Sequence, residues 1–169
     1  MMWVVEIRRA TEEDWPGIWP IWHQVVATGE TYCWLPDTDE PTARAAWMLP
    51  EPAQVFVATG AGGVIGTALL RPNQPGLGSH VANAAFMVDP SAHGQGLGRR
   101  LATHVLHQAR EQGYRAMQFN AVVSTNTAAL RLWTSLGFRV VGTVPEAFRH
   151  ARAGLVDLHI MYRRLDRQP

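Results

Sequence analysis

The sequence predicts an α/β fold built on a mixed central sheet of about seven strands and about four helices. Segments rich in β-branched and aromatic residues alternate along the chain with segments whose apolar residues recur at helical spacing. Some expected strands are joined by short turns and others by whole helices, so the sheet should combine hairpins with crossovers. The expected order of elements is β-α-α-β-β-β-α-β-α-β-β.

Length and composition indicate one domain over residues 1–169. The chain has 47% apolar residues, 17% charged residues and a formal net charge of +1, which is typical of a globular protein and favours neither a nucleic-acid nor a membrane partner. The single cysteine, Cys33, excludes an internal disulfide. The opening segment has no apolar stretch of the signal-peptide kind, so we expect a cytoplasmic protein.

The first third of the chain predicts one strand and two helices. Residues 3–11 are rich in β-formers and end at a threonine with Asp14 three positions on, a capping pattern for the helix that follows. We expect Pro20 to kink or restart that helix. A second, short helix is expected from about Thr42 to Met48. The buried face of the first helix should carry Trp15, Ile18, Trp19, Trp22, Val25 and Val26.

The rest of the chain predicts six strands and two helices. A hairpin is expected around the TGAGG turn within residues 54–72. A helix should begin at Leu97 with Gly113 as its C-cap, and another should end at Gly137. The remaining strands are expected at residues 79–90, 116–124, 139–145 and 155–165.

The segment SAHGQGLGRR, residues 91–100, lies where a strand meets a helix and predicts an anion site. Its glycines, Gly94, Gly96 and Gly98, allow the main chain to approach an anion closely, and the helix N-terminus supplies free N–H groups and a favourable dipole. Arg99 and Arg100 add cationic donors.

Spacing separates this loop from other phosphate loops. The nucleoside triphosphate loop requires a lysine, and all 15 basic residues here are arginine. The dinucleotide fingerprint requires a different glycine spacing after a first strand and an acid about 20 residues later, which this segment lacks. A glycine-rich helix start without a ligand remains the alternative.

Two motifs resemble the GCN5-related N-acetyltransferase (GNAT) superfamily. The segment VDPSAHGQGLGRRL resembles its acetyl-CoA loop, although His93 stands where arginine or glutamine is usual. The segment STNTAALRLWTSLGFRVVG resembles a second motif, and the order of the motifs is that of the family. The resemblance spans about residues 4–164. The residues in register in the second motif are Asn126, Ala129, Trp133, Gly137 and Phe138.

This resemblance implies a mostly antiparallel sheet splayed between strands 4 and 5, with acetyl-CoA as co-substrate and no metal. The pantetheine arm would bond the main chain as an added strand would. From the residues alone, a helix N-cap also explains Asn126, a role compatible with a coenzyme contact, and core packing explains Trp133 equally well. The implied coenzyme-binding residues are Phe86, Met87, Val88, His93, Gly94, Gln95, Gly96, Leu97, Gly98, Arg99, Asn126, Ala129 and Trp133.

Acetyl transfer in a ternary complex needs a neutral amine, a stabilised oxyanion and a proton for the leaving thiolate. A main-chain N–H near Met87 or Val88 is the expected oxyanion donor. Many relatives have a tyrosine at the position of Trp133, but an indole N–H cannot supply the proton, so a water or another group must do so. Glu30 and Tyr32 are further catalytic candidates.

The acceptor side is less specified. The segment MQFNAVVSTNTAALRLWTSLGF looks closer to the branch of the superfamily that acts on proline analogues such as azetidine-2-carboxylate. Asn83, Asn120 and Tyr32 would then contact substrate; satisfied or exposed amides are the alternative for the two asparagines. Asp157 and His159 are further candidates to line the acceptor cleft. Trp22, Tyr32 and Trp34 would roof the pocket or belong to the core. His104 and His107 are expected to be solvated rather than metal ligands.

Three functional hypotheses follow. The first is an N-acetyltransferase for a small amine or amino acid, and the second is a transferase of the same fold for a protein N-terminus or lysine. The third is a non-catalytic acetyl-CoA-binding or sensing domain. The resemblance also implies a possible homodimer formed through the last strands.

Overall fold

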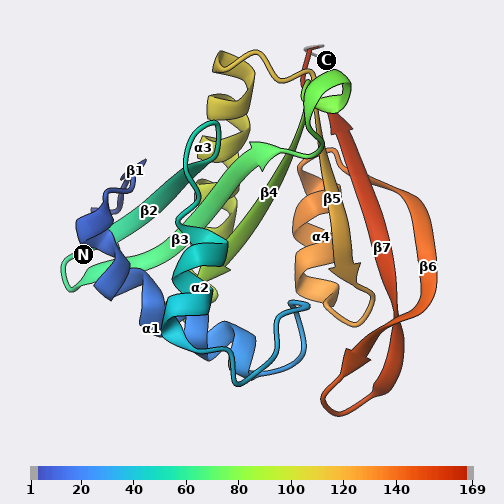
Figure 1. Cartoon of the computed structure of the whole chain (residues 1–169), viewed down its shortest axis with the longest axis horizontal. Coiled ribbons are helices and arrows are strands. Elements are labelled where there is room, and N and C mark those ends of the chain that lie inside the picture. The colour runs from blue at the N-terminus through green and yellow to red at the C-terminus, as the bar shows by residue number, and fades with distance from the viewer. Residues whose placement is uncertain (1–3, 167–169) are drawn as a thin grey trace.

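The computed structural model describes residues 4–166, which form one seven-stranded sheet with the order β1-β2-β3-β4-β5-β7-β6 (Figure 1). All neighbouring strands are antiparallel except β4 and β5, which are parallel. The strands are β1 (Glu6–Arg9), β2 (Gln54–Gly60), β3 (Gly63–Pro72), β4 (Val81–Val88), β5 (Ala116–Val123), β6 (Arg139–His150) and β7 (Gly154–Arg164). The helices are α1 (Trp15–Ala27), α2 (Glu40–Trp47), α3 (Leu97–Glu111) and α4 (Thr127–Ser135). The predicted fold class and element order are confirmed.

The helices lie in two layers, one on each face of the sheet. Helices α1 and α2 pack with Val57, Leu69 and Met87 in a tryptophan-rich core, in which Trp22 and Trp47 are fully buried. Helices α3 and α4 pack on the other face in a second core that includes Leu101. Because side chains alternate between the faces of a strand, β4 contributes to both cores.

Several boundaries differ from the sequence prediction. Helix α1 continues through Pro20 without a break. Pro20 is exposed, whereas Ile18 and Ile21 on either side of it are buried in one core, so packing holds the helix together across the missing N–H. Helix α2 begins earlier than expected because Asp39 caps it, accepting from Thr42 N–H at 2.9 Å.

Other elements differ only in length. The first strand is limited to Glu6–Arg9, and the start of its predicted range, Trp3, lies outside the described residues. Strand β6 extends to His150, past the predicted end. Helix α3 has Gln112 as its C-cap, with Gly113 one residue later. Gly137 lies in the same place after α4, as expected.

The pairing of β4 with β5 is short and positions the site. Only Val81 with Ala116 and Ala82 with Met117 are paired, after which the strands diverge towards the end of the sheet where the loop after α1 lies (Figure 1). Aromatic rings fill the space beside the divergence: the Phe86 ring lies 6.3 Å from that of Phe119 and 5.0 Å from that of Trp133, centroid to centroid. The predicted splay is confirmed.

A buried hydroxyl ties α2 to the sheet and yields a stability prediction. Trp47 Nε1 donates to Thr67 Oγ1 at 3.0 Å, and the Thr67 hydroxyl donates to the Phe56 carbonyl at 2.9 Å. Thr67→Val keeps the shape but leaves both partners unsatisfied, so we expect the free energy of unfolding in urea to fall by about 1–3 kcal/mol. Thr143→Val, on exposed β6, should change it by less than about 0.5 kcal/mol. Equal effects would contradict this assignment.

Candidate functional site

The glycine loop connects β4 to α3 through a single 3-10 turn, Pro90–Ala92. Asp89 holds the turn, because its Oδ1 accepts from Ser91 N–H at 2.8 Å. Gly94 and Gly96 then take φ angles of +78° and +73°, which side-chain-bearing residues rarely adopt. These two glycines turn the chain into α3, which begins at Leu97.

The main-chain donors in the second half of this loop are free. His93 N–H donates to the Pro90 carbonyl and Arg100 N–H donates to the Gly96 carbonyl. Within residues 4–166, the N–H groups of residues 94–99 have no hydrogen-bond partner, and they lie at the N-terminus of a helix of 15 residues. Free N–H groups and the helix dipole together favour a bound anion.

The side chains of the loop divide into exposed and packed groups. His93, Gly94, Gln95 and Gly96 are exposed, whereas Leu97 is buried in the core beneath α3. A Cβ on Gly98 would lie 3.6 Å from Leu132 Cδ2, so Gly98 is at the close approach of α3 to α4.

The two arginines point to different neighbours. Arg99 donates to Ser135 Oγ at 2.6 Å, which joins α3 to α4 beside the loop. Arg100 donates to the Val5 carbonyl at 3.0 Å and is thereby directed towards the start of the chain. Of the two arginines predicted to assist anion binding, Arg99 is therefore directed towards α4 and Arg100 is directed away from it.

The main chain of β4 presents hydrogen-bonding groups to the splay. Asp89 N–H donates to the Ile65 carbonyl on the β3 side, whereas the N–H and C=O of Phe86 face the opposite side. Because main-chain groups alternate along a strand, Met87 is directed to β3 and Val88 to the splay. Met87 is therefore poorly placed as an oxyanion donor, and Val88 N–H keeps that predicted role.

Tyr32, in the loop after α1, is bonded to Phe86. Its hydroxyl donates to the Phe86 carbonyl at 2.5 Å and accepts from Phe86 N–H at 3.0 Å. Desolvation raises the pKa of Tyr32 to about 12, so the hydroxyl stays protonated at neutral pH. The ring stacks on Trp34 with 5.4 Å between centroids. Trp34 is half-buried beside fully buried Trp22, so these tryptophans belong to the core under α1 and α2.

The second motif forms the start and the buried face of α4. Asn126 caps the helix, with its Oδ1 accepting from Ala129 N–H at 3.2 Å. Trp133 is 8% exposed and lies 4.6 Å from Phe119 and 5.8 Å from Phe138, ring to ring. The structural explanations for Asn126 and Trp133 therefore hold, and their coenzyme contacts stay predictions.

The two strand asparagines predicted to contact substrate have protein partners. Asn83 Nδ2 donates to the Gln118 carbonyl at 2.9 Å, bridging β4 to β5 near their paired end. Asn120 donates to Asn73 Oδ1 at 2.7 Å and accepts from Gln118 Nε2 at 3.0 Å. Their role as substrate contacts stays a prediction. Asn73 was not foreseen, because no local pattern marks a residue 47 positions away as a partner.

The other candidates are scattered. Asp157 Oδ1 accepts from Glu146 N–H, and His159 Nδ1 contacts Thr143 Oγ1, so both lie on the last hairpin. His107 is exposed, as expected. His104 is only half-exposed, because one side of its ring packs edge-on against Phe56 of β2.

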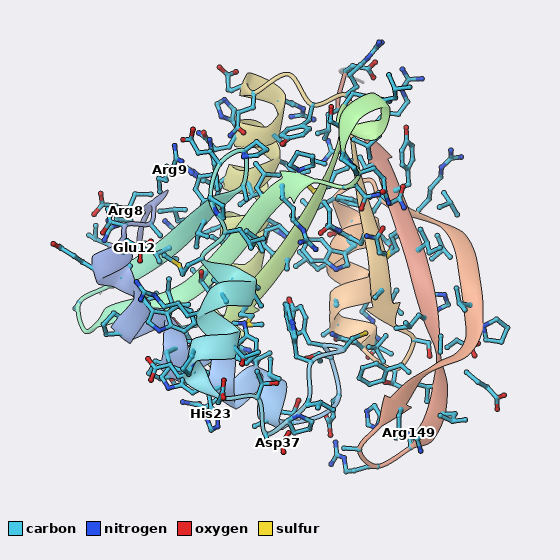
Figure 2. The ribbon with its side chains drawn as sticks, in the orientation of Figure 1. Arg8, Arg9, Glu12, His23, Asp37 and Arg149 are labelled. Carbon is cyan, nitrogen blue, oxygen red and sulfur yellow. The ribbon has the colours of Figure 1, made fainter. Side chains whose placement is uncertain are left out.

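Glu30 joins the loop after α1 to the tip of the β6–β7 hairpin. Its carboxylate lies 2.6 Å from the Arg152 guanidinium, and Ala151 N–H donates to the Gly29 carbonyl at 3.0 Å. Figure 2 shows the two segments at the same end of the molecule, with Asp37 on the loop and Arg149 on the hairpin.

An open hollow of about 480 Å³ lies where these segments meet the start of α4. The sequence analysis identified Glu30 and Asn126 but not the residues of the β6–β7 hairpin, because the sequence of a turn does not show which distant segment the turn will contact. The hollow is lined by Glu30, Thr31, Thr125, Asn126, Thr127, Ala128, His150, Arg152 and Ala153.

The arrangement can hold an extended, anionic ligand. The free N–H groups of the glycine loop would take its charged part, and the splay-facing groups of β4 would hold an amide-bearing arm. The hollow of mixed charge at the open end can admit a second, small polar molecule. No helix within residues 4–166 has both the length and the apolar character needed to cross a membrane.

Two similar structures cover nearly the whole chain. A GCN5-related N-acetyltransferase from Kribbella flavida is 48% identical, with a TM-score of 0.90 and coverage of 95% of this chain and 97% of that one. The structure of yncA from Salmonella typhimurium, with its cofactor acetyl-CoA, is 28% identical, with a TM-score of 0.82 and coverage of 98% and 96%.

Curated sequences agree with these structures. An L-methionine sulfoximine/L-methionine sulfone acetyltransferase from Pseudomonas aeruginosa is 32% identical over 146 residues, which is 83% of each protein. Two other curated relatives, N-acetyltransferase aca1 from Schizosaccharomyces pombe and Protein SPT10 from Saccharomyces cerevisiae, are matched over only 47% and 12% of their own lengths. The profile described as "Acetyltransferase (GNAT) family" matches residues 6–138. The chain therefore belongs to the acetyltransferase (GNAT) family of enzymes.

Proposed function

We propose that this protein is an acetyl-CoA-dependent N-acetyltransferase that acts on the amine of a small molecule or amino acid. The observation that carries the proposal is the succession of two sets of main-chain groups: the splay-facing edge of β4 is followed, after the single turn Pro90–Ala92, by the free N–H groups of residues 94–99. Such a surface matches a coenzyme with amides at one end and a pyrophosphate at the other. The family relative with bound acetyl-CoA supports this choice of co-substrate.

The coenzyme would lie along these residues in order. The pyrophosphate would accept from the N–H groups of residues 94–99, with Arg99 beside it, and Val88 would bond the pantetheine arm. Asn126 and Ala129 at the start of α4 would border the other side. This assignment needs no metal ion.

The reaction would be a direct attack in a ternary complex. The neutral amine nitrogen bonds to the thioester carbonyl carbon, the carbon–sulfur bond breaks, and the thiolate takes up the proton that the new amide nitrogen releases. Holding both substrates in one site supplies much of the acceleration. A splay-facing main-chain N–H of β4 at or near Val88 would stabilise the oxyanion, and Glu30, in the hollow, is the candidate to take the extra proton from a protonated amine before the attack.

An amino-acid acceptor is favoured by two features. The Pseudomonas aeruginosa relative acts, by its name, on amino-acid derivatives. The hollow also contains both a carboxylate, Glu30, and a guanidinium, Arg152, which suit the two charges of an amino acid. The narrower choice of a proline analogue, with Asn83, Asn120 and Tyr32 as contacts, is part of this proposal.

For domain organisation, location and partners, the proposal keeps the expectations from the sequence: one domain, in the cytoplasm, with no nucleic-acid partner.

We also propose a homodimer. Strand β6 forms one edge of the sheet and carries Val140, Val141 and Val144, each about half exposed.

The activity test is thiol release from acetyl-CoA over acceptors of several classes. We expect turnover with amino acids or cyclic imino acids and little with polyamines or with peptides that carry a free N-terminus. Turnover confined to peptides would replace the small-molecule proposal with a protein acetyltransferase. If acetyl-CoA raises the melting temperature but no acceptor releases thiol, the protein is a coenzyme-binding domain and the enzymatic proposal fails.

The glycine loop is tested by a pair of glycine variants at the two ends of α3. Gly96→Ala and Gly113→Ala both place an alanine at positive φ, at +73° and +86°, with no atom within 4 Å of the new Cβ. Each should cost about 1 kcal/mol in unfolding free energy. Only Gly96→Ala should raise the Kd for acetyl-CoA in calorimetry, by roughly 10-fold or more, because the new methyl group and altered φ disturb the anion site. A similar Kd for both variants would exclude this loop as the anion site.

A further inference from the structure

The Tyr32 hydroxyl makes an unusual pair of hydrogen bonds. It both donates to and accepts from the main chain of one residue, Phe86, which is 54 positions away. Phe86 lies in the part of β4 that has separated from β5. The hydroxyl therefore replaces the strand that would otherwise satisfy both main-chain groups of this residue.

The surroundings hold Tyr32 in this place. Its ring stacks on Trp34, and the Trp34 ring lies 5.2 Å from that of Trp22, which is fully buried. Trp34 also lies edge-on to Trp47, whose Nε1 is bonded to Thr67. The contact with Phe86 is thus the end of a packed aromatic series and not an incidental contact of a loop side chain.

The position of this contact along β4 matters for a coenzyme bound there. Phe86 and Val88 face the same side of the strand and are about 6.6 Å apart along it. An arm whose last amide bonds at Val88 is followed by the short cysteamine link and then by the thioester. That link covers about the same distance, so the thioester carbonyl would arrive at Phe86 N–H, the donor that Tyr32 occupies.

We propose that Tyr32 is a placeholder for the thioester: its hydroxyl occupies the Phe86 N–H until the carbonyl oxygen of acetyl-CoA displaces it. Tyr32 is then a specificity-determining residue, because the exchange depends on the acetyl group and not on the rest of the coenzyme. Coenzyme A, the product, has no carbonyl at this point and leaves the contact in place. This inference rests on the proposed function, since it requires acetyl-CoA to lie along β4.

The test compares Tyr32→Phe with Tyr114→Phe. Tyr114 is also half-buried, and its hydroxyl has no hydrogen-bond partner in the described part of the chain, so its variant controls for the loss of a hydroxyl alone. The Kd values for acetyl-CoA and for coenzyme A are measured by calorimetry on both variants and on the wild type.

Tyr32→Phe should bind acetyl-CoA about 2- to 10-fold more tightly than the wild type. In this variant no hydrogen bond to Tyr32 has to be broken, and Phe86 N–H is an unsatisfied donor before the ligand binds. The Kd for coenzyme A should change by less than about 2-fold, and Tyr114→Phe should change neither. An equal change for both ligands, or weaker binding of acetyl-CoA alone, would overturn the inference. Failure of the wild type to bind either ligand would instead reject the proposed function.

The same exchange can be followed in the wild type, which covers the case in which Tyr32→Phe does not fold. In ¹⁵N-labelled protein, the amide resonance of Phe86 should move on addition of acetyl-CoA and move much less with coenzyme A. The neighbouring amide of Val88 should respond to both. A Phe86 resonance that shifts equally with the two ligands contradicts the placeholder.

Discussion

The early end of the pairing between β4 and β5 is the constraint on which the rest of the structure depends. After two residue pairs the strands separate, and the main-chain groups of β4 lose the partners that a sheet normally provides. Aromatic rings keep the strands apart, since Phe86, Phe119 and Trp133 are mutually in contact beside the divergence. A continuous sheet here would leave no edge for a ligand to pair with.

The two layers of the fold have different functions around this edge. The layer of α3 and α4 supplies the glycine loop, the capped start of α4 and the link from Arg99 to Ser135, which together surround the proposed anion site. The layer of α1 and α2 supplies the loop that carries Glu30 and Tyr32. Because β4 packs into both cores, a ligand along it lies between the two layers.

The sequence predicted best those features that depend on neighbouring residues. The positive-φ glycines before α3, the cap at Asn126 and the turn after α4 are all specified within a few residues. The contact of Tyr32 with Phe86 could not be predicted, because it requires the loop after α1 to cross to a strand that comes much later in the chain. The predicted kink at Pro20 was wrong for a related reason. The sequence shows that proline removes a helix hydrogen bond, but it does not show that the residues on either side of Pro20 are buried in one core.

The contacts of Gly29 and Glu30 with the β6–β7 hairpin have a consequence for the order of assembly. They join a segment near the beginning of the chain to one near its end, at the mouth of the site. During synthesis this loop leaves the ribosome long before the hairpin does, so Tyr32 can dock on β4 while Gly29 and Glu30 have no partner until the hairpin is made. The entrance to the site is consequently completed late, after the glycine loop and the core under α1 and α2 have all of their residues available.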